Sequence, residues 1–423
     1  EISSCDWSSD VCSSDLSKIL FILGILAIFR LAANVPIPGI NAEQLRRFFD
    51  NNQLLGFLDM FSGGGLKNVS IVMLGVGPYI TASIIMQLMT IISPRLEQLY
   101  KEEGEAGRQK FNMWTRYLTV PLAILQGVAM ISLFKNSGLL VNFSAFNYIM
   151  AIVTVTAGTI FIMWLGELIT EKGLGNGVSL LIFAGIVAGL PSAIQQIMAT
   201  WDSTQMLTYG GFLVIGLITI AGVVLVNEGQ RTIPISFARR LRGGGLGNSK
   251  STLPLRVNQA GVIPIIFAMS ILQFPAIMAT FLAGVDNQVI ATYAGKVADL
   301  FANQVFHATF YFILVVVFTY FYTAVTFDPK NVAENLQRQG GFIPGIRPGV
   351  PTMEYLNKIV NRVTLTGAIF LGLIAILPFV VQGFTGIKTL TIGGTGILIV
   401  VSVVLELMKQ MEAQLVMRDY ESF

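Results

Sequence analysis

The chain has 423 residues, of which 53% are hydrophobic and only 12% are charged, and its formal net charge is +3. Soluble globular proteins carry about 25% charged residues, so this composition argues against a soluble protein and indicates one folded in a bilayer. Cysteine occurs only at Cys5 and Cys12, the only histidine is His307, and no HExxH, GxSxG or Walker motif is present. The sequence therefore predicts neither an enzyme nor a metal or cofactor site.

The first segment, residues 1–16, has a composition unlike that of the rest of the chain. It reads EISSCDWSSDVCSSDL, which is rich in serine pairs and aspartate and lacks a helical period. We expect this segment to be a non-native or disordered leader that takes no part in the fold.

Ten apolar segments follow, most of them close to the roughly 20 residues that a helix needs to cross the hydrocarbon core. Their apolar runs are too continuous for the alternating strands of a membrane β-barrel, and a helix satisfies its own backbone amides in lipid. The sequence therefore predicts an all-α polytopic membrane protein. Its ten transmembrane helices are expected at residues 18–33, 69–92, 114–134, 147–169, 177–197, 210–227, 258–282, 306–327, 359–381 and 393–411.

The distribution of positive charge predicts which connections are cytoplasmic. The connections after the second, fourth, sixth and eighth spans, together with the C-terminal tail, hold 19 of the 27 Lys and Arg residues, whereas the alternate connections hold six. Because cytoplasmic loops carry an excess of Lys and Arg, we expect the first set to be cytoplasmic. An even number of spans then places both termini in the cytoplasm.

Three connections are longer or more apolar than a simple link between helices requires. Residues 52–67 are apolar but too short to cross a bilayer, and they contain three consecutive glycines, so they form either a re-entrant element or an interfacial helix. The loops at residues 229–257 and 328–358 are basic and contain the Gly- and Pro-rich stretches GGGLG and FIPGIRPGVP. Their charge is either a topology signal alone or a docking surface for a large, partly anionic cytoplasmic partner.

The centres of the predicted spans hold almost no ionisable residues. Ion-coupled transporters keep such residues near the midplane, so the pattern argues against a secondary transporter of a small solute, which is the alternative function. Uncharged polar residues are present instead, and Ser83 and Gln87 share one helix face because they lie four positions apart. They serve either in hydrogen bonding between helices or along a seam that opens.

Nine stretches of the sequence, spread over nearly all of the chain from Ser17, form one pattern when they are taken in order. They are VPIPGI (35–40), MFSGGGL (60–66), GVGPYITASIIMQLM (75–89), EGEAGRQK (103–110), TRYLT (115–119), MWLGELITEKGLGNGVSLLIFAGIVAGLP (163–191), AGVIPIIFA (260–268), FIPGIRPG (342–349) and GGTGILIVV (393–401). In content and in order they resemble the SecY family.

This resemblance implies a channel that passes unfolded secretory proteins across the membrane and releases membrane segments sideways into lipid. The fold would consist of two inverted, pseudo-symmetric halves of five spans each, residues 17–198 and 199–423, with the polypeptide path between them. Where spans two and three face spans seven and eight, a lateral gate would include Ser83, Gln87 and Asn258. An aliphatic ring would close the path at mid-membrane, formed by Val76, Ile80, Val178, Ile182, Ile266 and Ile399.

The resemblance also assigns a short plug helix, at about residues 57–66, that seals the outer funnel at rest, with its glycines as hinges. The plug residues would be Leu58, Asp59, Met60, Phe61, Ser62, Gly63, Gly64 and Gly65. Guanidinium groups bind both carboxylates and RNA phosphates, so arginines in the two basic loops would dock cytoplasmic partners. These arginines are Arg239, Arg240, Arg242, Arg256 and Arg347.

The partners that the resemblance implies are the SecE and SecG subunits, the SecA motor, the ribosome with its nascent chain, signal peptides, unfolded polypeptides and membrane lipids. The implied location is the bacterial plasma (inner) membrane. Transport energy would then come from the partner motor or from translation, and no cofactor is implied.

Overall fold

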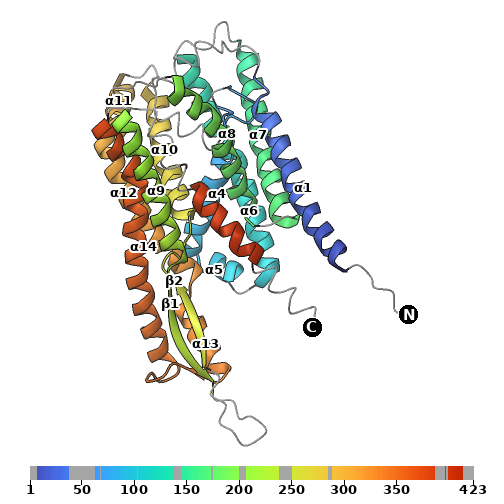
Figure 1. Cartoon of the computed structure of the whole chain (residues 1–423). Coiled ribbons are helices and arrows are strands. Elements are labelled where there is room, and N and C mark those ends of the chain that lie inside the picture. Colours follow the sequence, from blue (N-terminus) through green and yellow to red (C-terminus); the bar gives the residue numbers. More distant parts are fainter. Residues whose placement is uncertain are drawn as a thin grey trace, which may run out of the picture.

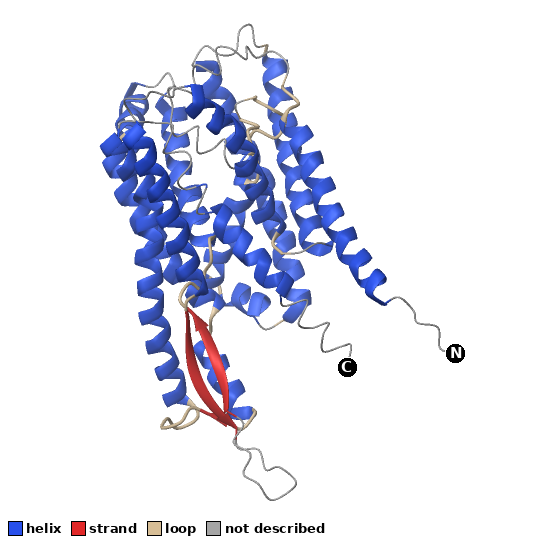
Figure 2. Cartoon of the chain, viewed as in Figure 1, coloured by secondary structure: helices blue, strands red, loops and turns tan. Residues whose placement is uncertain are grey.

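The structure is a computed structural model that describes residues 7–37, 62–66, 68–101, 103–136, 144–172, 175–199, 206–237, 250–283, 288–385, 396 and 399–412. In this part of the chain, long helices run side by side in a bundle, and a β-hairpin projects from one end of it (Figures 1 and 2). The described chain begins at Trp7 and ends at residue 412, and both of these points lie toward the end of the bundle that carries the hairpin (Figure 1).

Each of the ten predicted spans overlaps a described helix. These are α1 (Trp7–Ala33), α4 (Gly77–Ile92), α6 (Gly104–Asn136), α7 (Ala145–Lys172), α8 (Gly177–Ala199), α9 (Met206–Glu228), α10 (Ile263–Ala283), α12 (Gln304–Thr326), α14 (Val350–Thr385) and the helical residues 399–412. The prediction of a polytopic helical membrane protein is thus confirmed.

Among the described residues, four helical segments are by themselves long and apolar enough to cross a membrane. They are Gly104–Lys135, Ala145–Lys172, Gln304–Arg338 and Val350–Gly383. A fifth candidate consists of α4 and the short helix α5 (Pro94–Lys101), which meet at a bend of 114°. The helices α8, α9 and α10 contribute shorter apolar stretches.

Two boundaries differ from the sequence prediction. The helix α1 begins at Trp7, so it includes ten residues of the segment that we expected to lie outside the fold; that stretch contains no Gly or Pro, and extending an existing helix is favourable once it has begun. The second span begins at Gly77 rather than at residue 69, because the preceding residues form turns with positive φ at Val69 and Gly75. Pro78 then occupies the first turn of α4, where proline is well tolerated.

The helix α7 approaches the turn before α4 closely, and this approach depends on a glycine. A Cβ atom at Gly158 of α7 would lie 2.0 Å from the carbonyl oxygen of Ile71, and this oxygen belongs to backbone that cannot move aside cheaply. Small residues at such positions allow membrane helices to pack closely in the absence of a hydrophobic driving force.

The two basic loops form a small sheet, which the sequence analysis did not predict. The strands β1 (Gln230–Phe237), β2 (Lys250–Arg256) and β3 (Gly341–Phe342) pair antiparallel in the order β2-β1-β3. Because β3 follows the helix α13 (Pro329–Arg338), the sheet joins the loop after α9 to the loop after α12. Ile233, Leu255 and Leu356 pack beneath it, so both loops share one apolar core outside the spans.

The main apolar core lies at the centre of the bundle. It contains buried residues from α1, α4, α7, α8, α10, α12, α14 and the final helix, among them Ile162, Leu181 and Leu272. A second buried cluster, which includes Leu66, Met73 and Phe134, packs around the turns before α4. The main core includes Ile80, Ile182 and Ile266, which also line a cavity between the helices.

Candidate functional site

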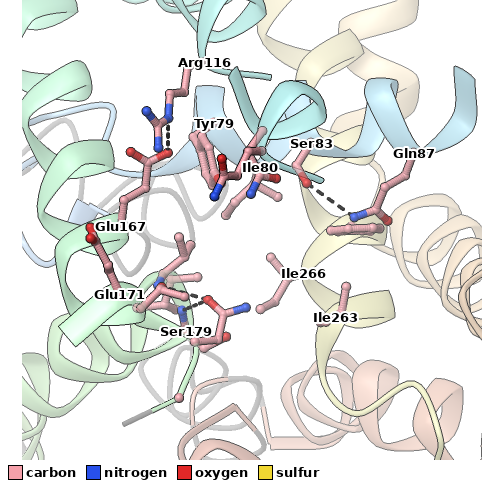
Figure 3. Close-up of a pocket in the computed structure, with 18 of the residues that line it drawn as sticks. Tyr79, Ile80, Ser83, Gln87, Arg116, Glu167, Glu171, Ser179, Ile263 and Ile266 are labelled. Carbon is pink, nitrogen blue, oxygen red and sulfur yellow. Dashed lines mark hydrogen bonds and ion pairs between the residues drawn. The ribbon is translucent and has the colours of Figure 1, made fainter. Parts of the chain in front are cut away.

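A cavity of about 1120 Å³ lies between the helices, toward the end where α6 begins and α7 ends. Its lining comes from α4, α6, α7, α8, α10, α12, the turn at residues 175–176 and the final helix (Figure 3). Segments that are more than 300 residues apart in sequence, such as Tyr79 and Glu406, therefore contribute to the wall of one chamber.

Aliphatic side chains form the inner part of this wall. Four of the six predicted ring residues line the cavity, and they are Ile80, Val178, Ile182 and Ile266. The other two, Val76 and Ile399, do not line it but belong to the same buried apolar cluster. Of the six, only Val178 is half-buried, whereas the others are at most 5% exposed. Four of the predicted residues thus share one cavity and all six belong to one apolar cluster, whereas their role as a constriction stays a prediction.

A polar pair on α4 lies beside this apolar surface. Ser83 and Gln87 both line the cavity, and the Gln87 side-chain amide donates to the Ser83 hydroxyl at 3.4 Å (Figure 3). The Gln87 Oε1 atom is buried and has no hydrogen-bond partner in the described part of the chain. Because α10 packs against both α4 and α6, the pair lies near the seam between the first and the second set of spans.

Asn258, the third predicted gate residue, does not line the cavity. Its amide donates to Asn227 Oδ1 at 2.7 Å and to the Gly261 carbonyl at 3.1 Å. The Asn227 amide in turn donates to the Ser402 hydroxyl at 3.2 Å, and Lys409 donates to the Asn227 carbonyl at 3.2 Å. Asn258 therefore connects the start of α10 to the end of α9 and the final helix, and its role in a gate stays a prediction.

Charged side chains form the outer rim of the cavity. Arg116 on α6 donates through Nε to Glu167 on α7 at 2.6 Å (Figure 3). Glu105, Lys110 and Glu171 also line the cavity. Sequence reasoning used Arg116 only as a topology charge and missed this ion pair, because the two residues lie 51 positions apart with no motif to connect them. The cavity is thus wettable at its rim and apolar at its inner end.

The candidate plug is described in part. Leu58, Asp59, Met60 and Phe61 lie outside the described residues, whereas Ser62, Gly63, Gly64 and Gly65 are within them. The Ser62 hydroxyl accepts from the Leu66 amide at 2.9 Å, and both of these residues are at most 1% exposed. The described residues of this segment, 62–66, are mostly buried, as a re-entrant element requires.

The plug glycines adopt conformations that few other residues tolerate. Gly63 and Gly64 have φ of 66° and 82°, in the left-handed region that favours glycine. A Cβ atom on Gly63 would lie 2.6 Å from the Phe29 ring of α1, and the Gly63 carbonyl accepts a hydrogen bond from the Arg30 guanidinium. Gly63 is thus held against α1 by a close contact and by a charged donor.

Two of the five candidate docking arginines are described, and both lie at the end of the bundle that carries the sheet. Arg256 is exposed at the end of β2, where it pairs with Gln230, and Arg347 is exposed in the turn that follows β3. Arg239, Arg240 and Arg242 lie outside the described residues. The sheet therefore holds Arg256 and Arg347 at one end of the molecule, on the two loops that the sequence analysis singled out.

A membrane-spanning helical bundle with a cavity that is polar at its rim and apolar within has the organisation of a channel. Solved channel structures share this fold. A protein-conducting channel superposes with a TM-score of 0.62 at 18% identity, over 93% of this chain and 91% of that one. Sec61 from a canine ribosome-channel complex of the endoplasmic reticulum superposes with a TM-score of 0.58 at 17% identity, over the same shares of the two chains.

Sequence comparison identifies the family. The sequence model of the SecY family matches residues 70–408. The protein translocase subunit SecY of Streptomyces coelicolor is 43% identical over 424 residues, and that of Mycobacterium tuberculosis is 41% identical over 427 residues, in each case over 96% of both chains. The chain belongs to the SecY family. The predicted resemblance is confirmed, and the alternative of a small-solute transporter is not favoured.

Proposed function

We propose that this chain is the protein-conducting subunit of a Sec translocase, which passes unfolded secretory proteins across a membrane and releases apolar segments into lipid. The observation that carries the proposal is that Ile80, Val178, Ile182 and Ile266 line one cavity with a polar rim, while Val76 and Ile399 belong to the same apolar cluster. Membership of the SecY family and the fold of solved protein-conducting channels support it.

An aliphatic constriction suits a passage that must admit many sequences. Such a ring offers a passing chain neither hydrogen bonds nor fixed charge, and at rest it excludes water and ions by dewetting. All six proposed members are Val or Ile, whose branching at Cβ restricts χ1 and so keeps the aperture defined. The buried segment from Ser62 to Gly65 would act as the plug outside this ring.

The lateral exit is proposed at the contact of α10 with α4 and α6. Ser83 and Gln87 supply polar atoms near this seam, and Gln87 Oε1 has no hydrogen-bond partner among the residues that the structure describes. Breaking such a contact costs less than parting a fully paired polar network or a tightly packed apolar one. The two five-span halves, residues 17–198 and 199–423, are the bodies that would move apart.

Partners and location follow from the same reasoning. The exposed Arg256 and Arg347 would contact the SecA motor or a ribosome with its nascent chain, because guanidinium groups bind carboxylates and RNA phosphates alike. SecE and SecG are proposed as companion subunits. Membership of the SecY family, with relatives from bacteria, supports a place in the bacterial plasma membrane. The excess of Lys and Arg in alternate connections supports an orientation with both termini in the cytoplasm.

Disulfide crosslinking to a transport substrate tests the proposed path. In a background with Cys5→Ser and Cys12→Ser, single cysteines are placed at Ile182 and Ile266, which line the cavity, and at Leu373 of α14, which is 52% exposed. A stalled secretory chain with one cysteine is then tested for crosslinks in membranes. We expect crosslinks from Ile182→Cys and Ile266→Cys and none from Leu373→Cys.

Comparison with the control position Leu373→Cys separates specific from non-specific contact. Crosslinks at Leu373→Cys as strong as those at the cavity positions would mean that contact is non-specific. If the folded, membrane-inserted variants gave no crosslink at either cavity position, the polypeptide path would not pass this cluster and the proposal would fail.

A further inference from the structure

The helix α11 (Gln288–Ala302) has no part in the proposed conducting path. It connects α10 to α12 and lies at the end of the bundle opposite the β-hairpin (Figure 1). One face packs along α10 and α12, where Ala294 is buried and the Phe301 ring contacts those of Phe306 and Phe310 at 5.5 and 6.1 Å. By the charge distribution of the loops, this end of the bundle is the outer one.

The exposed surface of α11 divides into two arcs. At 3.6 residues per turn, Val289, Tyr293, Val297 and Leu300 fall within one arc that adjoins the packed face. These side chains are between 42% and 67% exposed. The exposed polar residues Thr292, Lys296 and Asp299 occupy the neighbouring arc. A helix that is apolar on one flank and polar on the next has the pattern of one that lies in the plane of a membrane interface.

The helix α12, which follows α11 after a single residue, also exposes apolar side chains, and as a membrane-spanning helix it presents them to lipid. Val305, in the first turn of α12, is 75% exposed, and Ile313 and Val317 further along this membrane-spanning helix are about half exposed. Lys296 Nζ lies 5.8 Å from the centre of the Tyr293 ring. Tyrosine favours the depth of the headgroups, and lysine extends its ammonium toward the polar side, where lipid phosphates lie.

We propose that α11 is seated in the outer leaflet of the bilayer, with its apolar arc among acyl chains and Lys296 at the phosphates of the lipid headgroups. Phospholipid is favoured over a second protein as the occupant because α11 leads directly into a membrane-spanning helix whose exposed apolar side chains face lipid. The seated helix would anchor the outer ends of α10 and α12, the former of which carries Ile266. This inference depends on membrane insertion and orientation and not on protein conduction.

Spin-label accessibility tests the proposal in the full chain. In a background with Cys5→Ser and Cys12→Ser, a nitroxide is attached to one cysteine at Val297, Leu300 or Asp299, and the chain is reconstituted in vesicles of phosphatidylethanolamine and phosphatidylglycerol. Collision rates are measured with oxygen, which concentrates in lipid, and with a water-soluble nickel chelate. We expect oxygen to dominate at Val297 and Leu300 and nickel to dominate at the adjacent Asp299.

Two standards calibrate these rates within the same protein. Leu217→Cys, on the exposed face of α9, reports the lipid phase, and Arg347→Cys reports the aqueous phase. Access by nickel at Val297 and Leu300 equal to that at Arg347 would place the helix in water and overturn the proposal. Low access to both reagents at Val297 and Leu300 would mean that a partner protein or a second copy covers the arc, which would overturn it equally.

Discussion

Replacing Gly63 by alanine should loosen the buried segment that packs against α1, and Gly64→Ala supplies the matched control. Both glycines have positive φ, at 66° and 82°, so either substitution introduces backbone strain. Only Gly63 also faces a close neighbour, because its Cβ would lie 2.6 and 2.9 Å from two atoms of the Phe29 ring. The atom nearest to a Cβ on Gly64 is a flexible Arg30 nitrogen at 3.3 Å.

The structure gives the expected size of the difference. A left-handed conformation costs an alanine roughly 1–2 kcal/mol, and this cost is shared by the two variants. The Gly63 Cβ would overlap the ring by about 1 Å relative to an ordinary carbon contact, and overpacking of this kind costs typically 1–3 kcal/mol. The free-energy cost of Gly63→Ala should therefore exceed that of Gly64→Ala by about 1–3 kcal/mol. This difference corresponds to a roughly 5–150-fold larger population of the displaced segment.

The assay is the resting ion leak of the chain reconstituted in planar bilayers without a transport substrate. We expect the largest leak from Gly63→Ala, a smaller leak from Gly64→Ala and the smallest leak from the unaltered chain. Because Phe29→Leu removes the ring atoms that the new methyl group meets, the double variant should lower the leak of Gly63→Ala to about that of Gly64→Ala. Equal leak from the two alanine variants, with no effect of Phe29→Leu, would refute the packing argument.

Three further predictions concern stability, measured as the thermal or denaturant midpoint of the detergent-solubilised chain. Arg116→Ala removes the ion pair with Glu167, yet these side chains are 49% and 21% exposed, so screening should limit the loss to about 0.2–1 kcal/mol. Asn227→Ala leaves buried partners unpaired on two other segments and should cost about 1–3 kcal/mol, more than the ion pair. Gly158→Ala forces a methyl group to within 2.0 Å of the Ile71 carbonyl and should destabilise the fold more than either, so a neutral outcome would contradict the close approach of these segments.

Much of the architecture was predictable because membrane helices obey strong local constraints. Every backbone amide in lipid needs a partner within the same segment, so apolar runs of the right length could be assigned as helices without knowledge of their neighbours. The start of the second span was wrong by eight residues because the turns that begin at Val69 are as apolar as the helix that follows. Hydropathy does not distinguish a buried turn from a buried helix.

The small sheet was missed because its determinants are not local. The strand β1 contains Pro234 and β2 contains Pro254, and proline in a run argues against a strand. What stabilises the strands is packing of Ile233 and Leu255 against Ile343 and Leu356, which come from a loop about a hundred residues further along. Such pairing follows only from the arrangement of α9, α10, α12 and α14.

The candidate ring was predictable only through the family resemblance. In sequence, Ile80 and Ile182 are ordinary apolar residues in apolar helices, and periodicity does not distinguish a pore-facing side chain from one that faces lipid. The polar contacts were even harder to predict from the sequence. The ion pair of Arg116 with Glu167 and the hydrogen bond between Asn227 and Asn258 join residues that are 51 and 31 positions apart. No spacing rule connects these pairs, because their geometry is set by how whole helices cross.

The proposed ring and the proposed plug would contribute unequally to closure. Ile80, Ile182, Ile266 and Ile399 are each at most 5% exposed, and exposing a fully buried side chain of this size costs about 1.5–3 kcal/mol. Opening the ring to water would therefore cost about 6–12 kcal/mol in all, whereas an apolar segment in transit would replace the lost contacts. A loosened plug shifts its own equilibrium by only about 1–3 kcal/mol. Gly63→Ala should consequently raise the leak by a measurable ratio while the ring still keeps most channels closed.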